Sequence, residues 1–225
     1  MTTDEYFVVS QEFQFNRFLL SVYNGQITEQ YVLLVHRDSG IERIEDLRGR
    51  TLAVFKNARM SLAPIWLDVR LIEAGFSGTT GFCGHVTPIS KLSQTVLKVF
   101  FRQIDACLVT RRGFETMNEL NPQLGQQLKV LVESPELVPT VFCCRADLSL
   151  AVKDQLLAEF VKVHTTPAGQ QVLTIFQSDQ LTEGQASCLD SALELRAKHD
   201  RLCGVTNRVA AGVRVPAQTA EKVPK

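Results

Sequence analysis

The sequence predicts an α/β fold, in which a mostly parallel sheet is covered by helices. Strand-like and helix-like segments alternate from about residue 31 onward, which is the order typical of βαβ units. The 225 residues are 45% hydrophobic, which is enough to bury one sizeable core or two small lobes. Two strand-like segments run directly into loops that precede helices, so the same pattern also predicts where a ligand binds.

Residues 32–54 form the clearest unit of this pattern, with the sequence VLLVHRDSGIERIEDLRGRTLAV. Its two hydrophobic strands flank a short predicted helix, whose apolar face consists of Ile41, Ile44 and Leu47. Gly49 can take the left-handed conformation that ends a helix. The second strand enters a polar loop, residues 56–60, which opens a helix at Ser61. Because a helix N-terminus presents free N–H groups, this loop is a candidate anion site.

Further elements are predicted downstream of this unit. Ser61 fits the N-cap of the helix that follows it. Thr87 and Pro88 fit the first positions of another helix, which leads to the strand IDACLV, residues 104–109. That strand also runs into a loop, at Thr110.

The C-terminal part of the chain is predicted to be mainly helical. The strands LKVLVES and VFCC come first, separated by the proline-bounded link PELVP. Helical segments then extend through TTPAGQQVLTIF and LTEGQASCLDSALELRAKHDRL. Residues 204–225 have small and polar side chains and no apolar periodicity, which predicts a disordered tail.

Charge and composition exclude several partners. Lys plus Arg and Asp plus Glu each total 24, so no long-range field attracts nucleic acid or an anionic membrane. The 6 cysteines lack the CxxC spacing of a zinc site, and buried free thiols are typical of a reducing compartment. The first residues do not encode a signal peptide, and no apolar run approaches the roughly 18 residues of a membrane helix. We therefore expect no nucleic-acid partner and no membrane insertion.

The sequence also lacks common catalytic motifs. HExxH, GxSxG, GxxxxGKS/T and GxGxxG do not occur, so hydrolase, kinase and dinucleotide-binding functions lack their minimal parts. We expect a protein that is not an enzyme and that needs neither a cofactor nor a metal.

Four segments, taken in their order along the chain, carry a family resemblance: YVLLVHRDSGIERIEDLRGRTLAVF, the helix ending in EAGF, GFCGHVTPISKLSQTVLKVFFRQIDACLV, and LKVLVESPELVPTVFCCRADL. They resemble the phosphate, phosphite and phosphonate substrate-binding proteins of ABC transporters, over most of residues 1–200. The resemblance implies a periplasmic-binding-protein-like fold, in which two crossover strands join two α/β lobes that clamp a ligand by hinge closure.

The resemblance also implies a division of the chain. Residues 1–30 would be the remnant of a first lobe, and residues 31–147 a complete second lobe with YVLLVHR and VFCCRAD as crossover strands. Residues 148–203 would be C-terminal helices that pack toward the first lobe, before the tail at 204–225. Family members carry a signal peptide and a half-lobe ahead of this region, so we expect an N-terminally truncated protein that is marginally stable or self-associates.

Five residues are candidates for the ligand site. Ser61 matches one position of a serine- and threonine-rich turn of the family, and Arg59 stands in the same turn as a replacement donor. His85 matches the family's histidine at the start of the next helix in the second lobe, and Tyr6 matches a tyrosine of the first lobe. Thr110 follows from its place at the carboxyl end of a strand, where open α/β sheets bind ligands.

Each of these residues also has a purely structural interpretation, which stays open at this point. Ser61 can be only an N-cap, and Arg59 can be a solvated side chain. His85 can be a structural histidine, Thr110 a turn residue and Tyr6 a core aromatic.

The resemblance implies the substrate-binding component of an ABC transporter. Its ligand would be a phosphate-, phosphite- or phosphonate-like oxyanion, its partner an ABC permease and its location periplasmic; a chain that truly starts at this Met would remain cytoplasmic. Two alternatives remain: a ligand-sensing module that signals to a sensor kinase, and a transferase or synthase on the same fold.

Overall fold

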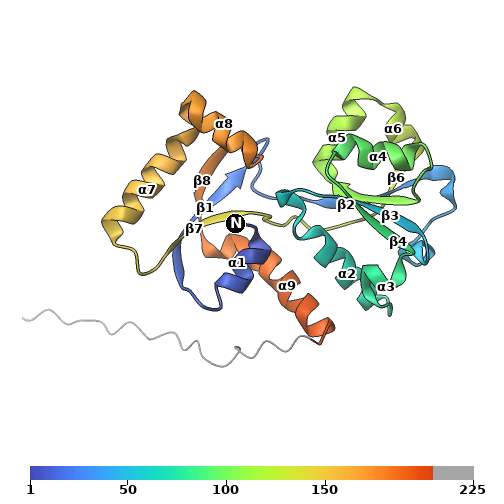
Figure 1. Cartoon of the computed structure of the whole chain (residues 1–225), viewed down its shortest axis with the longest axis horizontal. Coiled ribbons are helices and arrows are strands. Elements are labelled where there is room, and N and C mark those ends of the chain that lie inside the picture. The colour runs from blue at the N-terminus through green and yellow to red at the C-terminus, as the bar shows by residue number, and fades with distance from the viewer. Residues whose placement is uncertain (205–225) are drawn as a thin grey trace, which may run out of the picture.

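The protein folds into two α/β lobes joined by two extended segments (Figure 1). The computed structural model describes residues 1–204, of which about half are helical, and its strands form two separate sheets. The tail predicted at 204–225 therefore lies outside the described residues, apart from Gly204. Among the described residues, no helix combines the length and the apolar character that crossing a membrane requires.

The larger lobe is built on a five-stranded sheet with the order β4-β3-β5-β2-β6. Its strands are β2 (Tyr31–His36), β3 (Thr51–Phe55), β4 (His85–Ile89), β5 (Ala106–Thr110) and β6 (Leu128–Glu133). β3 runs parallel to β4 and β5, whereas β2 runs antiparallel to β5 and β6. Every residue of β2 and β5 is buried, so both faces of the central sheet are covered.

The sheet is mixed because β2 runs against the other four strands, and this one strand departs from the mostly parallel sheet predicted from the sequence. The connector between β2 and β3 contains only two short 3-10 turns, η1 (Arg37–Ser39) and η2 (Ile44–Leu47). A parallel connection must return along the whole sheet, and these turns are too short to do so. Gly49 has a φ of 69°, the left-handed conformation expected of it.

The larger lobe's helices are α2 (Ala63–Glu73), α3 (Gly78–Phe82), α4 (Leu92–Phe100), α5 (Arg111–Leu120) and α6 (Gln123–Gln127). The helix predicted to start at Thr87 is wrong, because residues 85–89 form β4 and the helix begins at Leu92. Pro88 is tolerated there because β4 lies at the edge of the sheet, where a missing N–H breaks no ladder bond. Val96 and Val99 face the core, as expected.

The smaller lobe has a three-stranded antiparallel sheet with the order β7-β1-β8. Its strands are β1 (Phe15–Val22), β7 (Val141–Arg145) and β8 (Gln180–Gly184), and its helices are α1 (Thr3–Val9), α7 (Leu150–Lys162), α8 (Pro167–Ile175) and α9 (Asp190–Leu202). Alternate residues of β1 face opposite sides: Leu20 packs with α1 and Leu19 with α7 and α8. The helix predicted from Leu181 onward is wrong at its start, since pairing with β1 makes this segment β8.

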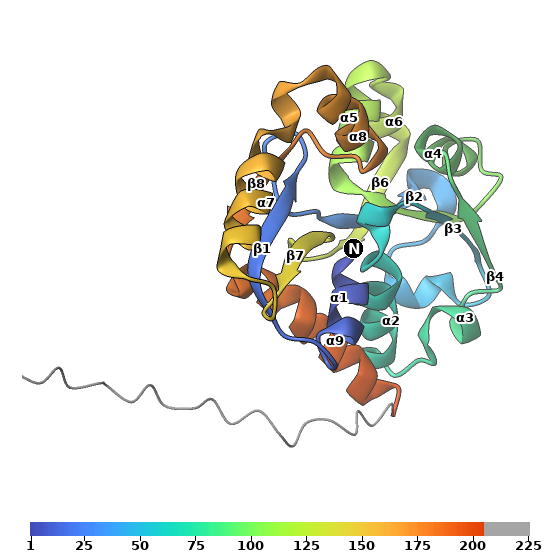
Figure 2. The ribbon, with the colours of Figure 1, turned by 60° about the vertical axis from the view of Figure 1, so that its left-hand side comes forward.

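Two segments cross between the lobes, residues 23–30 and 134–140. They pair with each other through Glu29 and Leu137, whose N–H groups donate to one another's carbonyls at 2.8 and 2.9 Å. YVLLVHR and VFCCRAD are therefore not the crossovers: the first forms β2 and the second contributes β7 to the smaller lobe. Away from the crossovers, α9 lies against α2, so the lobes also touch through helices (Figure 2).

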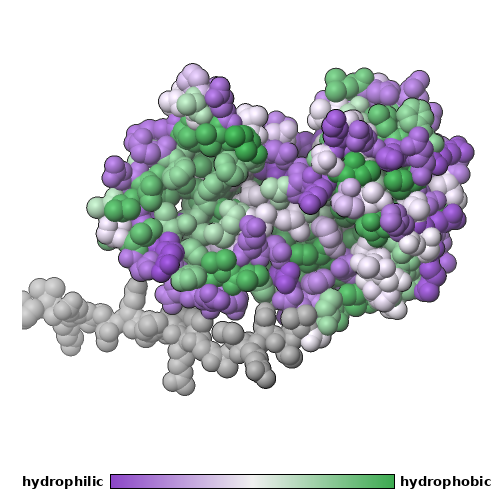
Figure 3. Space-filling view, viewed as in Figure 1, coloured by the Kyte–Doolittle hydropathy of each residue, from purple (hydrophilic) through white to green (hydrophobic). Residues whose placement is uncertain are grey.

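Apolar side chains gather on the outer surface of the smaller lobe (Figure 3). The exposed large hydrophobic residues there are Leu148, Leu150, Val152, Leu156, Phe160, Val172, Ile175 and Phe176. They come from α7, α8 and the segments beside them, and β7 is an edge strand of the sheet below. Self-association of the chain stays a prediction that this surface supports.

Candidate functional site

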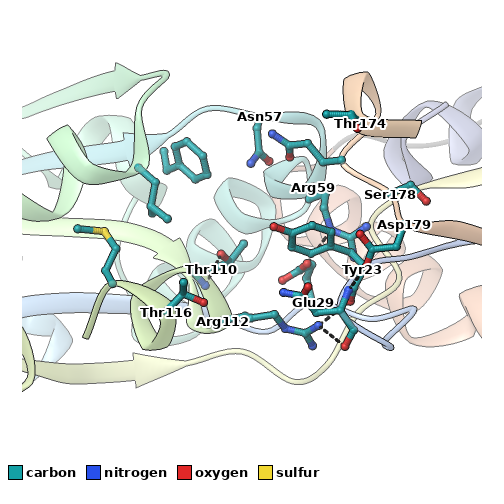
Figure 4. A pocket seen from close by; sticks show the side chains of 16 residues that line it. Tyr23, Glu29, Asn57, Arg59, Thr110, Arg112, Thr116, Thr174, Ser178 and Asp179 are labelled. Carbon is teal, nitrogen blue, oxygen red and sulfur yellow. Dashed lines mark hydrogen bonds and ion pairs between the residues drawn. The ribbon is translucent and has the colours of Figure 1, made fainter. Parts of the chain in front are cut away.

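A cavity of about 450 Å³ lies between the lobes (Figure 4). The larger lobe contributes the last residues of β3 and β5, Phe55 and Thr110, and the starts of α4 and α5. The smaller lobe contributes the end of α8 and residues 177–179, and the first crossover contributes Tyr23 and Glu29. Because β3 and β5 are parallel, their carboxyl ends meet at this edge of the sheet, where open α/β sheets bind ligands.

Arg59 is a buried cation in this cavity, with only 2% of its surface exposed. It lies in the short turn η3 (Ala58–Met60) after β3. Its Nε donates to Glu29 at 2.6 Å, its Nη1 donates to Ser21 at 3.2 Å, and its guanidinium lies 5.3 Å from the ring centre of Tyr23. Its Nη2 is buried and has no hydrogen-bond partner among the described residues. The solvated interpretation of Arg59 is thus wrong, and one of its nitrogens is left for a further acceptor.

The backbone of Arg59 is held in place as well. Tyr31 donates its hydroxyl hydrogen to the Arg59 carbonyl at 2.9 Å. Burial, reinforced by the charge of Glu29, raises the pKa of Tyr31 far above its ordinary value, so this hydroxyl remains a donor. The side-chain oxygen of Asn57 accepts from the Met60 N–H at 3.0 Å, which fixes the turn and leaves the Asn57 amide hydrogens free to donate.

Thr110 is the N-cap of α5, whose first turn lines the cavity. Its Oγ1 accepts from the Gly113 N–H at 3.2 Å, in the first turn of α5. A Cβ on Gly113 would lie 2.7 Å from both Thr110 Oγ1 and a Leu92 methyl group, so a larger residue there would require one of these side chains to move. Thr110, Arg112 and Gly113 line the cavity, so the positive end of the α5 dipole lies at its wall, which favours a negative ligand group.

Arg112 and Asp179 connect the two lobes at the rim of the cavity. Arg112 Nη1 donates to the carbonyls of Tyr23 and Asn24 at 2.6 and 3.3 Å. The Asn24 N–H donates to the carboxylate of Asp179 at 2.5 Å. In Figure 4, Arg112 reaches from the larger lobe toward Tyr23, while Asp179 lies on the opposite side with Ser178. The loop at Asn24 is thus held from both lobes.

The structure does not bring the other candidate residues into this cavity. The Ser61 hydroxyl donates to the carbonyl of Pro139, in the second crossover, at 3.3 Å. His85 is exposed at the start of β4, and the cavity lies at the carboxyl ends of the parallel strands, so His85 lies at the opposite end of the sheet. Tyr6 is buried in the smaller lobe against Phe15 and Phe18, and this burial raises its pKa. Only Arg59 and Thr110 line the cavity together.

Several cavity residues were missed from the sequence. Glu29, Arg112 and Asp179 are single charges in polar segments, a pattern that ordinary surface loops share. The start of α4 lines the cavity, and this is the helix at whose start the family histidine was expected. The residue found there is Leu92. Within residues 1–204, no cluster of three or more His, Cys, Asp or Glu side chains is arranged to hold a metal ion.

A cavity between two α/β lobes that are joined by paired crossovers defines a two-lobed ligand-binding protein. The family model described as "ABC transporter, phosphonate, periplasmic substrate-binding protein" matches residues 1–189. The chain belongs to this family. A comparison with curated protein sequences finds no significant match.

Solved structures share the fold at low sequence identity. XAC2383 from Xanthomonas citri, solved with chloride and with ATP, superposes with a TM-score of 0.64 and 17–18% identity, covering 90–91% of this chain and 77% of its own. A binding-protein component of an ABC phosphonate transporter from Pseudomonas aeruginosa has a TM-score of 0.58 and 21% identity, covering 86% of this chain and 65% of its own. PhnD1 from Prochlorococcus marinus, solved with methylphosphonate, has a TM-score of 0.56 and 16% identity, covering 83% and 72%.

Proposed function

We propose that this protein is the substrate-binding component of an ABC transporter and binds a phosphate-, phosphite- or phosphonate-like oxyanion between its lobes. One observation carries the proposal: Arg59 lines the cavity, and its buried Nη2 has no hydrogen-bond partner among the described residues. A buried donor without a partner is costly, and an oxyanion would supply the missing acceptor. The family and the methylphosphonate bound by PhnD1 support the same ligand class.

The cavity would bind an anion through directed donors instead of net charge. Two arginines and two carboxylates line it, so their formal charges cancel: Arg59, Arg112, Glu29 and Asp179. The donors that remain are Arg59 Nη2, the amide of Asn57 and the N–H of Arg112 in the first turn of α5. The Arg111 and Gly113 N–H groups of that turn already donate to Gln30 and Thr110. The remaining donors suit a head group with several acceptor oxygens, and the site requires no covalent step.

The lobes would transmit ligand binding to a permease. Donors on the larger lobe and the loop of residues 177–179 on the smaller lobe face one cavity, so a ligand that touches both favours their approach. The two crossovers supply the natural hinge, because they are the only segments of residues 1–204 that run from one sheet to the other. An ABC permease would then recognise the closed arrangement of the lobes.

Titration calorimetry tests the ligand class. Phosphate, phosphite, methylphosphonate and phenylphosphonate are titrated into the wild-type protein, into Arg59→Lys and into a control, Arg17→Lys. Lysine keeps a positive charge beside Glu29 but lacks the second guanidinium nitrogen, so we expect at least a tenfold loss of affinity. Arg17 pairs with Asp154 on the surface, outside the cavity, and its replacement should leave binding unchanged. Absence of binding with all four anions would refute the proposal.

A further inference from the structure

The wall of the cavity on the larger lobe is apolar in addition to its polar donors. Phe55, Leu92 and Met117 line it, from the end of β3, the start of α4 and the middle of α5. Phe55 is buried, and the other two are half-buried. The same Leu92 side chain that lies against Gly113 thus also faces the cavity. None of these three side chains can donate a hydrogen bond to an oxyanion.

Part of the polar lining lies apart from this wall, although Thr110 and Gly113 lie next to Leu92. Figure 4 shows Asn57 and Arg59 between the lobes, and Thr174, Ser178 and Asp179 on the smaller lobe. An oxyanion held at Arg59 Nη2 therefore uses one part of the cavity only. The side chains of Phe55, Leu92 and Met117 themselves offer it no donor and favour a group without polar atoms.

The size of the cavity also exceeds what a small oxyanion needs. A void of about 150 Å³ is enough to hold a benzene ring, and pockets of about 300–1,000 Å³ hold drug-sized ligands. The cavity of about 450 Å³ thus has room for an oxyanion head and an organic group of several carbons. Because the lining charges cancel, a small and strongly hydrated dianion gains little there in return for its lost water.

Resting on the function proposed above, we propose that the cavity selects an organic oxyanion with an apolar substituent, such as an aryl- or long-chain alkylphosphonate, over inorganic phosphate and methylphosphonate. The phosphonate oxygens accept from Arg59 and from the start of α5. The substituent packs on Phe55, Leu92 and Met117, where burial of its apolar surface adds affinity. This wall then sets the specificity, while Arg59 sets the ligand class.

A panel with one constant head group tests this inference. Methylphosphonate, phenylphosphonate, hexylphosphonate and 2-aminoethylphosphonate are titrated calorimetrically into the wild-type protein. We expect phenyl- and hexylphosphonate to bind at least tenfold more tightly than methylphosphonate. Equal or tighter binding of methylphosphonate would overturn the inference and leave the proposed function intact. Preference for 2-aminoethylphosphonate would also overturn the inference, because it would indicate that the ammonium group pairs with Asp179 and that the apolar wall does not decide the ligand.

Variants of the apolar wall test whether it causes the preference for apolar substituents. Met117→Gln keeps the length of the side chain but adds a polar amide, and Leu92→Asn is a second, independent variant. Each should reduce the phenyl-to-methyl affinity ratio at least threefold. The control Leu120→Gln is on the same helix as Met117 but outside the cavity, where Leu120 is 83% exposed, and it should keep the ratio. An unchanged ratio in both wall variants, with thermal melts like that of the control, would refute the assignment. If no member of the panel binds, and phosphate and phosphite do not bind either, the proposed function itself fails.

Discussion

The guanidinium of Arg59 is held on three sides, by Glu29, by Ser21 and by the ring of Tyr23. Both members of the ion pair are almost fully buried, with 3% of each side chain exposed. Taking two charges out of water is unfavourable, and their attraction offsets this only while both are present. The arginine is therefore positioned before any ligand arrives, and its position depends on Glu29.

Replacement of Arg59 by Met should destabilise the protein by about 3–5 kcal/mol, because Glu29 is left as a buried charge without its partner. The double variant Arg59→Met, Glu29→Gln removes both charges and should recover most of this loss. Urea unfolding followed by circular dichroism measures both free energies. A loss below about 1 kcal/mol in the single variant would contradict the buried pair.

The cysteines should differ widely in reactivity. Burial, helped by the charge of Asp68, raises the pKa of Cys83 to about 11, and burial alone raises the pKa of Cys107 further. Since the thiolate is the reactive form, both should resist alkylation in the folded protein at pH 8. Cys203 is an exposed free thiol and should be labelled first. Mass spectrometry after an iodoacetamide pulse measures this order, which labelling of Cys107 as early as Cys203 would contradict.

At the scale of the elements, α5 and α8 share one kind of cap, a threonine whose hydroxyl accepts from the N–H of a glycine three positions later. Thr110 accepts from the Gly113 N–H at the start of α5, and Thr166 accepts from the Gly169 N–H at 3.1 Å at the start of α8. Replacement of either threonine by Ala should reduce the free energy of unfolding by about 1 kcal/mol. Only Thr110 lines the cavity, so only Thr110→Ala should also weaken oxyanion binding. Equal affinities of the two variants in calorimetry would remove Thr110 from the site.

Asp105 ties the start of β5 to the start of β3. Its partial burial disfavours the charged form, but hydrogen bonds from the Thr51 hydroxyl and N–H at 2.6 and 2.8 Å, together with nearby Arg50, outweigh this and lower its pKa. A lowered carboxyl pKa contributes stability above about pH 4, and this contribution is lost as pH falls through the folded-state pKa. Asp105→Asn should therefore cost about 2 kcal/mol at pH 7 and progressively less below pH 4. Urea melts across this pH range measure it, and a constant difference would contradict it.

Strands β2, β3, β5, β6 and β7 could be predicted from the sequence, whereas β1, β4 and β8 were missed. β2, β3 and β5 are short apolar runs covered on both faces, so composition alone marks them. β4 contains Pro88 and β8 has the polar sequence QLTEG, and both become strands only because a neighbouring strand pairs with them. Strand direction was out of reach for the same reason, since it depends on how far each connector extends in space.

The site was predictable only where a strand end marks it. Thr110 is the last residue of a buried strand, and Arg59 lies in the loop after another, so both could be found along the chain. Glu29 lines the cavity from a crossover and Asp179 from the smaller lobe. Contacts between segments so far apart in the sequence cannot be predicted from a local sequence pattern. His85 was misplaced because the strand and the helix that follow it were merged into one predicted helix.

For the whole molecule, the path of the chain sets an order of folding. The strands of the larger lobe come from one continuous stretch, residues 31–133, whereas the sheet of the smaller lobe joins β1 to β7 and β8 from the other end of the chain. One hydrogen bond of this lobe, from the Ser178 hydroxyl to the Val22 carbonyl, closes a loop of 156 positions. Contacts of such long sequence separation form late, because loop closure costs entropy before they contribute.

The larger lobe should therefore be complete before the two ends of the chain meet. Pulsed hydrogen exchange during refolding should show protected amides in β2 and β5 earlier than in β1, and simultaneous protection would argue for one cooperative step. During synthesis, β1 leaves the ribosome long before its partners β7 and β8 exist. Its apolar residues stay exposed and unpaired during that time, which makes this strand a binding segment for a chaperone.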